Sequence, residues 1–71
     1  MDDSGKLMTM LQHWLEHNDE HADTYAMWAN KPPALAIGGL PELLNRISAE
    51  TKKISRLFEE AISLIESSGE K

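Results

Sequence analysis

The sequence contains no cysteine, so neither a disulfide nor a thiolate metal ligand can stabilise the chain. This matters because a chain of 71 residues buries a small fraction of its surface and is only marginally stable by itself. Two kinds of reinforcement stay open, a bound metal ion and association with another chain. The sequence therefore predicts one domain over residues 1–71 that one of these reinforces.

Long apolar runs and a basic surface are also missing. No segment approaches the roughly 20 apolar residues of a membrane span, and the start MDDSGKL lacks the basic flank and apolar run of a secretory signal. The net charge is −5, and residues 1–30 carry six carboxylates against Lys6 alone. The lack of a signal and of a membrane span leads us to expect a cytoplasmic protein. Because an acidic surface repels phosphate, we expect neither a nucleic-acid nor a membrane partner.

What the chain does contain is helical periodicity, in two segments. In the first, large apolar side chains recur at helical spacing from Leu7 to Trp28, after an acidic DDS start that suits a helix N-terminus. The sequence NKPP ends this helix, because proline disfavours helical geometry in the residue before it. We expect helix 1 over residues 4–30.

The second periodic segment follows a connector, residues 31–40, whose Leu35 and Ile37 we expect to lie against the core. Pro41 suits the first turn of a helix, and the pattern predicts helix 2 over residues 41–67. The apolar residues of this segment are assigned to one buried stripe: Leu40, Leu43, Leu44, Ile47, Ile54, Leu57, Phe58, Ala61, Ile62 and Ile65.

Two amphipathic helices joined by about ten residues predict an all-α fold, an antiparallel helical hairpin. A hairpin alone leaves half of each apolar stripe in water. A twofold homodimer that completes a four-helix bundle is the simplest remedy. Docking on another protein, or assembly into a larger ring, is the alternative.

Polar residues interrupt both apolar stripes. On a helical wheel Asn18 falls in the middle of the first stripe, and Glu50 and Thr51 fall inside the second. In an antiparallel hairpin with this connector, residues at one height have numbers that sum to about 71, so His21 faces Glu50. Buried polar groups cost stability unless each has a partner, and this predicts a specific polar layer.

The histidines stand four residues apart, at His13, His17 and His21. Imidazoles at positions i and i+4 share a helix face and can chelate one divalent ion, whereas His13 and His21, roughly 12 Å apart, cannot. His17 and His21 with Glu50 would supply two nitrogens and a carboxylate, with open positions for zinc, nickel, cobalt or iron. His13 with His17 is the other available pair.

Other interpretations of these residues stay open. His21 could hydrogen-bond Glu50 or Asn18 while the remaining histidines flank the helix, or three stacked imidazoles could act as a pH-sensitive contact. The aromatic residues of helix 1 are candidates for the core, for the interface between chains or for a pocket wall beside the histidines: Trp14, Tyr25 and Trp28.

The segment HWLEHNDEHADTYAMWA resembles a family of small, largely uncharacterised prokaryotic helical-hairpin domains with the pattern H-W-x-x-H-N-x-x-H-A. Members are sometimes associated with nickel-binding accessory proteins of the CooT type, so the resemblance implies nickel. It covers residues 13–29 and implies shared polar and aromatic positions at His13, His17, Asn18, His21, Trp14 and Trp28.

These observations predict a divalent metal-binding helical accessory protein, of nickel or zinc type, that serves a metalloenzyme or accessory-protein partner. The alternative is a structural or adaptor dimerisation module without metal, with a buried His-Asn-Glu polar layer. An enzyme is not expected, because the sequence offers no nucleophile with a base and no glycine-rich phosphate loop.

Overall fold

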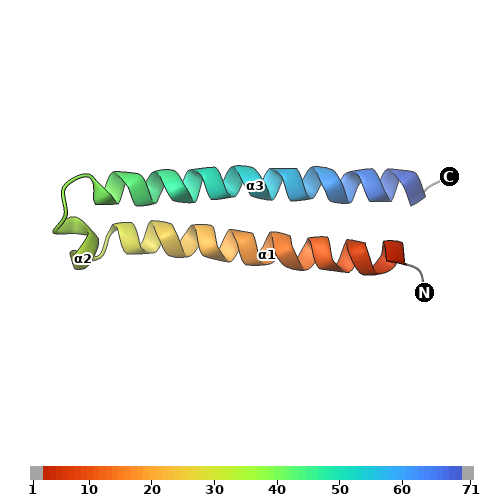
Figure 1. Cartoon of the computed structure of the whole chain (residues 1–71), viewed down its shortest axis with the longest axis horizontal. Helices are drawn as coiled ribbons and strands as arrows, with labels where there is room; N and C mark the ends of the chain where they lie inside the picture. The colour runs from red at the N-terminus through yellow and green to blue at the C-terminus, as the bar shows by residue number, and fades with distance from the viewer. Residues whose placement is uncertain (1–2, 70–71) are drawn as a thin grey trace.

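The computed structural model describes residues 3–69, which form two long helices and a short one (Figure 1). Helix α1 spans Asp3–Ala29, α2 spans Pro32–Leu35 and α3 spans Leu40–Gly69. Helices α1 and α3 lie side by side in opposite directions, and α2 lies at the end of the hairpin away from the two termini (Figure 1). The fold is an all-α helical hairpin, as the sequence predicts.

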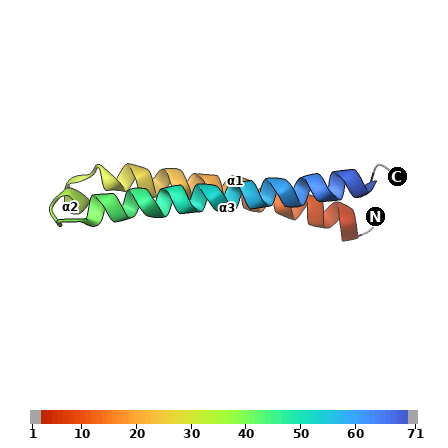
Figure 2. The same ribbon diagram turned by 90° about the horizontal axis from the view of Figure 1, so that it is seen from above.

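The hairpin is long and thin, measuring 54 × 17 × 11 Å. Its radius of gyration is 16.3 Å, whereas a compact domain of this length has about 11 Å. Seen after a quarter turn, the two long helices cross at a shallow angle and overlap around the middle of the hairpin (Figure 2). Within residues 3–69, neither long helix has a stretch apolar enough to cross a membrane.

The acidic start and the proline pair define the limits of α1. Asp3 supplies a negative charge in the first turn of α1, which the helix dipole favours, while Asp2 lies outside the described residues. At the other end Lys31 adopts an extended conformation (φ −93°, ψ 153°), as expected for a residue before proline. Pro32 and Pro33 then open α2, where no amide hydrogen is needed.

The connector differs from its predicted packing. It contains one helical turn, α2, which directs Ala34 at the hairpin (4% exposed) and leaves Leu35 and Ile37 in solvent (60% and 57% exposed). Successive residues on a helix point about 100° apart, so a single turn that buries Ala34 turns Leu35 away. The expectation that Leu35 and Ile37 lie against the core is wrong.

Helices α1 and α3 meet along a line of residues spaced alternately three and four apart, which is the heptad spacing of coiled coils. We call this line the inner seam. Its buried and half-buried members are Met8, Leu11, Leu15, Asn18, Ala22, Tyr25 and Ala29 on α1, and Leu44, Ser48, Thr51, Ser55, Phe58, Ile62 and Ile65 on α3. In the part of the chain that the structure describes, no large side chain is fully buried. The hairpin alone therefore has a thin core.

The apolar residues of α3 form two stripes instead of the predicted one. Leu44, Phe58, Ile62 and Ile65 lie in the inner seam, whereas a second set is 46% to 62% exposed: Leu43, Ile47, Ile54 and Leu57. Both sets repeat with the same heptad spacing and lie next to each other on the helix. A helical wheel therefore shows them as one wide apolar stripe. Four of the ten predicted core residues of α3 are thus on the surface.

Candidate interaction face and histidine row

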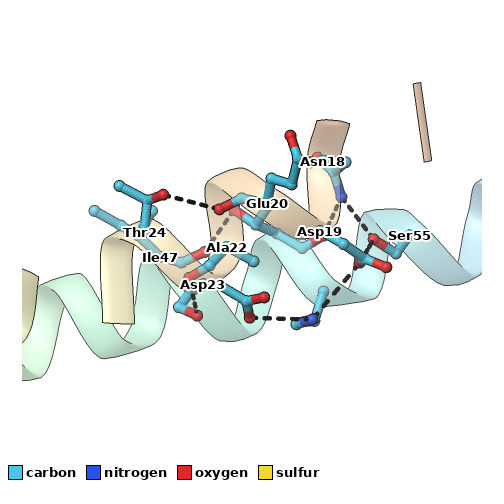
Figure 3. A network of polar contacts seen from close by, with 11 residues as sticks. Asn18, Asp19, Glu20, Ala22, Asp23, Thr24, Ile47 and Ser55 are labelled. Carbon is cyan, nitrogen blue, oxygen red and sulfur yellow. Dashed lines mark hydrogen bonds and ion pairs between the residues drawn. The ribbon is translucent and has the colours of Figure 1, made fainter. Parts of the chain in front are cut away.

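The middle of the inner seam is polar, and Asn18 is at its centre (Figure 3). The Asn18 side-chain amide donates to the main-chain oxygen of Thr51 at 2.6 Å and to the Ser55 hydroxyl at 2.9 Å. The Ser55 hydroxyl in turn donates to the Asp19 carboxylate. Both amide hydrogens of Asn18 are used, so this half-buried group fixes the two helices in one register.

Next to Asn18 the two helices approach closely. The Ser48 hydroxyl donates to the main-chain oxygen of Ala22 at 2.7 Å, and Ala22 itself is fully buried. A side chain as short as serine can reach a carbonyl of the facing helix only where the residues between the helices are small. Ser48 and Ser55 were not among the residues predicted to be structural, although their heptad spacing with Leu44 marks them as members of the seam.

One side of the hairpin carries ion pairs between the helices. The Lys52 ammonium lies 3.4 Å from the Asp23 carboxylate and 3.7 Å from that of Asp19. These side chains are largely exposed, so each pair contributes little to stability. Their value here is geometric, because they show which side of α1 and which side of α3 adjoin one another.

Glu50 is predicted to lie inside the buried stripe of the second helix, but in the structure it lies outside it. Its side chain is 54% exposed and its carboxylate pairs with the Lys53 ammonium at 3.2 Å, one turn along the same helix. The inner seam passes through Ser48 and Thr51 instead, and Thr51 is half-buried with its hydroxyl bonded to Ile47 of its own helix. The wheel placed Glu50 in the core because it assigned the exposed Ile47 to the same stripe.

The histidines form a row along the exposed surface of α1. The ring centroids of His13 and His17 are 4.6 Å apart, and those of His17 and His21 are 5.9 Å apart. The row continues with Tyr25, whose ring stacks on His21 at 6.2 Å. Within the described residues, no group of three or more His, Asp or Glu side chains is placed to hold one metal ion. A single chain thus presents imidazole pairs without the third ligand expected from Glu50.

The two tryptophans lie on the surface beside this row. Trp14 is 41% exposed with its ring centroid 6.5 Å from that of Phe58, and Trp28 is 45% exposed with the Lys31 ammonium 4.2 Å above its ring. Tyr25 is half-buried. A shallow hollow that the structure contains is lined by residues of α3 alone, from Arg56 to Leu64. The aromatic residues therefore form a surface and not the wall of that hollow.

A second heptad line runs along each long helix, next to the inner seam. On α1 it contains Leu7, Met10, Trp14, His17, His21, Thr24 and Trp28, and on α3 it contains Leu40, Leu43, Ile47, Glu50, Ile54, Leu57, Ala61 and Leu64. Apart from the half-buried Leu40 and Ala61, every one of these side chains is exposed. We call the two lines together the outer face.

Both lines of the outer face lie on the same side of the hairpin. On each helix nearly every outer-face residue lies one position before a residue of the inner seam, so the line is turned by about 100° from the seam. Because the two helices are antiparallel, this shared offset turns both lines toward the same side of the hairpin. The ion pairs of Lys52 with Asp19 and Asp23 support this. These three residues each lie one position after a residue of the inner seam, and they meet on the other side of the hairpin. The hairpin therefore has a polar side with ion pairs and an apolar outer face.

A family comparison agrees with a single unit over most of the chain. No curated protein and no solved structure matches the chain. One family model matches residues 7–65, which include all three histidines and the whole outer face. The chain therefore belongs to the family described as a domain of unknown function, DUF8180.

Proposed function

We propose that this protein is a self-association module, in which two hairpins pair through their outer faces and complete a four-helix bundle. The observation that carries the proposal is the outer face itself, which has large exposed apolar side chains along α3 and toward both ends of α1, on a hairpin with almost no buried core. Contiguous exposed apolar surface of this kind is typical of an interface between proteins. The angle of about 100° between the two lines of each helix is close to the right angle that a square bundle requires.

The exposed area supports the same proposal. The hairpin exposes 5394 Å², whereas a folded monomer of 8.0 kDa is expected to expose about 4,450 Å². The excess of about 900 Å² compares with the roughly 800 Å² that each partner buries in a stable protein interface. Burial of this excess by pairing would therefore bring the surface exposed by each chain to the value expected of a folded monomer of its mass.

Sedimentation of the full chain, with two matched lysine variants, tests self-association. Ile54→Lys places a charge in the outer face, and Met27→Lys makes the same change in charge at an equally exposed apolar residue on another side of α1 (46% and 51% exposed). We expect the parent chain and Met27→Lys to sediment at twice the mass of 8.0 kDa, and Ile54→Lys to sediment as a monomer. A parent chain that stays monomeric at the highest soluble concentration would exclude the proposal.

We propose as a second candidate that the histidine row binds a divalent metal ion, nickel or zinc, in an accessory role toward a metalloenzyme. What favours it is the pair His17 and His21, exposed and four residues apart on one helix, with His13 and His17 as the other pair. The resemblance of the histidine pattern to domains associated with nickel accessory proteins also favours it. Two imidazoles leave the coordination sphere open, so the remaining ligands would come from water or from another chain.

Thermal melting with and without added zinc or nickel tests the metal site. At a metal concentration of 100 times Kd we expect about 2.7 kcal/mol of added stability. His17→Ala should abolish the gain, because His17 belongs to both pairs, while His21→Ala and His13→Ala identify which pair binds. Gln12→Ala, at an exposed position of the same helix, serves as the control. If the parent chain melts at the same temperature with and without metal, the metal proposal fails and self-association is unaffected.

A further inference from the structure

The contacts of the inner seam fix which residues of α1 and α3 lie at one height. Asn18 meets Thr51, and Asp19 meets Lys52. Residue numbers at one height therefore sum to about 70, which agrees with the register expected from the length of the connector. This register applies equally to the outer face, because both lines belong to the same two helices.

The polar members of the outer face gather in its middle. By the register above, His21 on α1 lies level with Glu50 on α3, and His17 lies about one turn away. Toward both ends the face is apolar, with the two tryptophans on the α1 line. Each hairpin thus presents imidazoles on one line and a carboxylate on the other, at the same height.

Two hairpins can pair through this face about a twofold axis in two ways. In the first, the axis runs along the bundle, each α1 faces the α3 of the partner, and both connectors lie at one end. In the second, the axis crosses the bundle, α1 faces α1, α3 faces α3, and the connectors lie at opposite ends. The two arrangements bury the same surface but oppose different side chains.

The first arrangement matches the outer face to itself. Because the axis preserves height, His21 comes opposite the partner's Glu50, and the carboxylate can accept a hydrogen bond from the imidazole. The apolar ends match as well, with Trp14 opposite the partner's Leu57 and Trp28 opposite the partner's Leu43. His21 and Glu50, which share one height in the middle of the interface, then each have a partner of complementary chemistry.

The second arrangement leaves Glu50 without such a partner. All three histidines are on α1, so an α3 line packed on another α3 line offers Glu50 an isoleucine, a leucine or a second Glu50. A carboxylate buried against apolar side chains or against another carboxylate is costly. Charge complementarity therefore selects the first arrangement.

We propose that the second copy binds with the bundle axis as its twofold axis, and that its Glu50 pairs with His21 and His17 in a polar layer between the chains. This inference rests on the proposed self-association and adds the orientation and the residues that determine it. It also assembles in trans the histidines and carboxylate that a single chain keeps apart.

A distance between the two connectors tests the orientation. The parent sequence has no cysteine, and a side chain at Gly38 would meet nothing within 4 Å, so Gly38→Cys gives a single site for a spin label. Pulsed electron spin resonance should give about 20 to 30 Å, since neighbouring helices lie 8 to 10 Å apart. A distance near the hairpin length of 54 Å would overturn the orientation while keeping self-association. Absence of any dipolar signal from a monomeric chain would overturn self-association itself.

An exchange of charges between chains tests the polar layer. Glu50→Lys opposes a cation to the imidazoles, and His21→Glu opposes a carboxylate to Glu50, so each variant alone should dimerise about tenfold or more weakly than the parent. In an equimolar mixture each mixed dimer has two complementary pairs. One is the native pair of His21 with Glu50, and the other is the introduced pair of a glutamate at position 21 with a lysine at position 50. Native mass spectrometry should therefore show the mixed dimer in excess over the homodimer of each variant.

Glu60→Lys, an exposed position of α3 outside the outer face, is the matched control and should dimerise as the parent does. Circular dichroism on each variant separates loss of pairing from loss of the helices. A random distribution of mixed and unmixed dimers would overturn the pairing of Glu50 with the histidines, even where the connectors lie at one end.

Discussion

Asn18 on α1 donates its amide to the main-chain oxygen of Thr51 on α3, across the inner seam at mid-length, at 2.6 Å. Since the second hydrogen of the same amide goes to the Ser55 hydroxyl, Asn18 serves only as a donor across this seam. A polar residue at a seam position usually lowers stability and fixes the register of the helices. In this hairpin it opposes two acceptors on α3, the Thr51 carbonyl and the Ser55 hydroxyl.

The first prediction concerns this donor role. Asn18→Asp keeps the shape of the side chain but replaces the amide with a carboxylate, which faces the Thr51 carbonyl and lies next to Asp19. We expect a loss of about 1 to 3 kcal/mol in the free energy of unfolding, the cost of leaving part-buried groups unpaired. Chemical denaturation followed by circular dichroism, at one fixed protein concentration, measures it.

Asn45→Asp is the matched control, because it makes the same chemical change at an exposed position of α3. It should change the free energy of unfolding by less than about 0.5 kcal/mol. Equal losses in the two variants would mean that Asn18 contributes no more than a surface residue.

The second prediction concerns the close approach of the helices at Ala22. This residue is fully buried against α3, and its main-chain oxygen accepts a hydrogen bond from the Ser48 hydroxyl at 2.7 Å. Ala22→Leu adds three carbons where none fit, so the helices must separate and the Ser48 hydrogen bond is lost. We expect a loss of about 1 to 3 kcal/mol, while Ala49→Leu on the exposed surface of α3 should be neutral within about 0.5 kcal/mol. Thermal melts of both variants, at equal concentration, check the difference.

The hairpin and its register could be predicted from sequence because they depend on local signals. Helical periodicity gives two helices, the NKPP sequence ends the first, and a connector of known length sets which residues share a height. The contact of Asn18 with Thr51 follows from that register. These features need no knowledge of which side of each helix is covered.

The assignment of sides could not be predicted in the same way. Ile47 and Glu50 were placed in the buried stripe of α3, yet the seam uses Ser48 and Thr51, one position along. A line of larger apolar residues next to a line of smaller ones reads as one wide stripe, and hydrophobicity alone favours the larger residues as the core. The choice is made by close packing of small residues such as Ala22, which composition does not reveal.

The last prediction concerns the two glycines that precede α3. Gly39 has a φ of +86°, in the left-handed region where a β-carbon is strained, whereas Gly38 lies outside that region and a β-carbon there meets nothing within 4 Å. Gly39→Ala should therefore lower the free energy of unfolding by about 1 to 2 kcal/mol, and Gly38→Ala should leave it unchanged or raise it by about 0.4 to 1 kcal/mol, because the unfolded chain loses freedom. Chemical denaturation of the two variants side by side measures both signs. Equal effects would mean that the chain enters α3 without needing the left-handed conformation at Gly39.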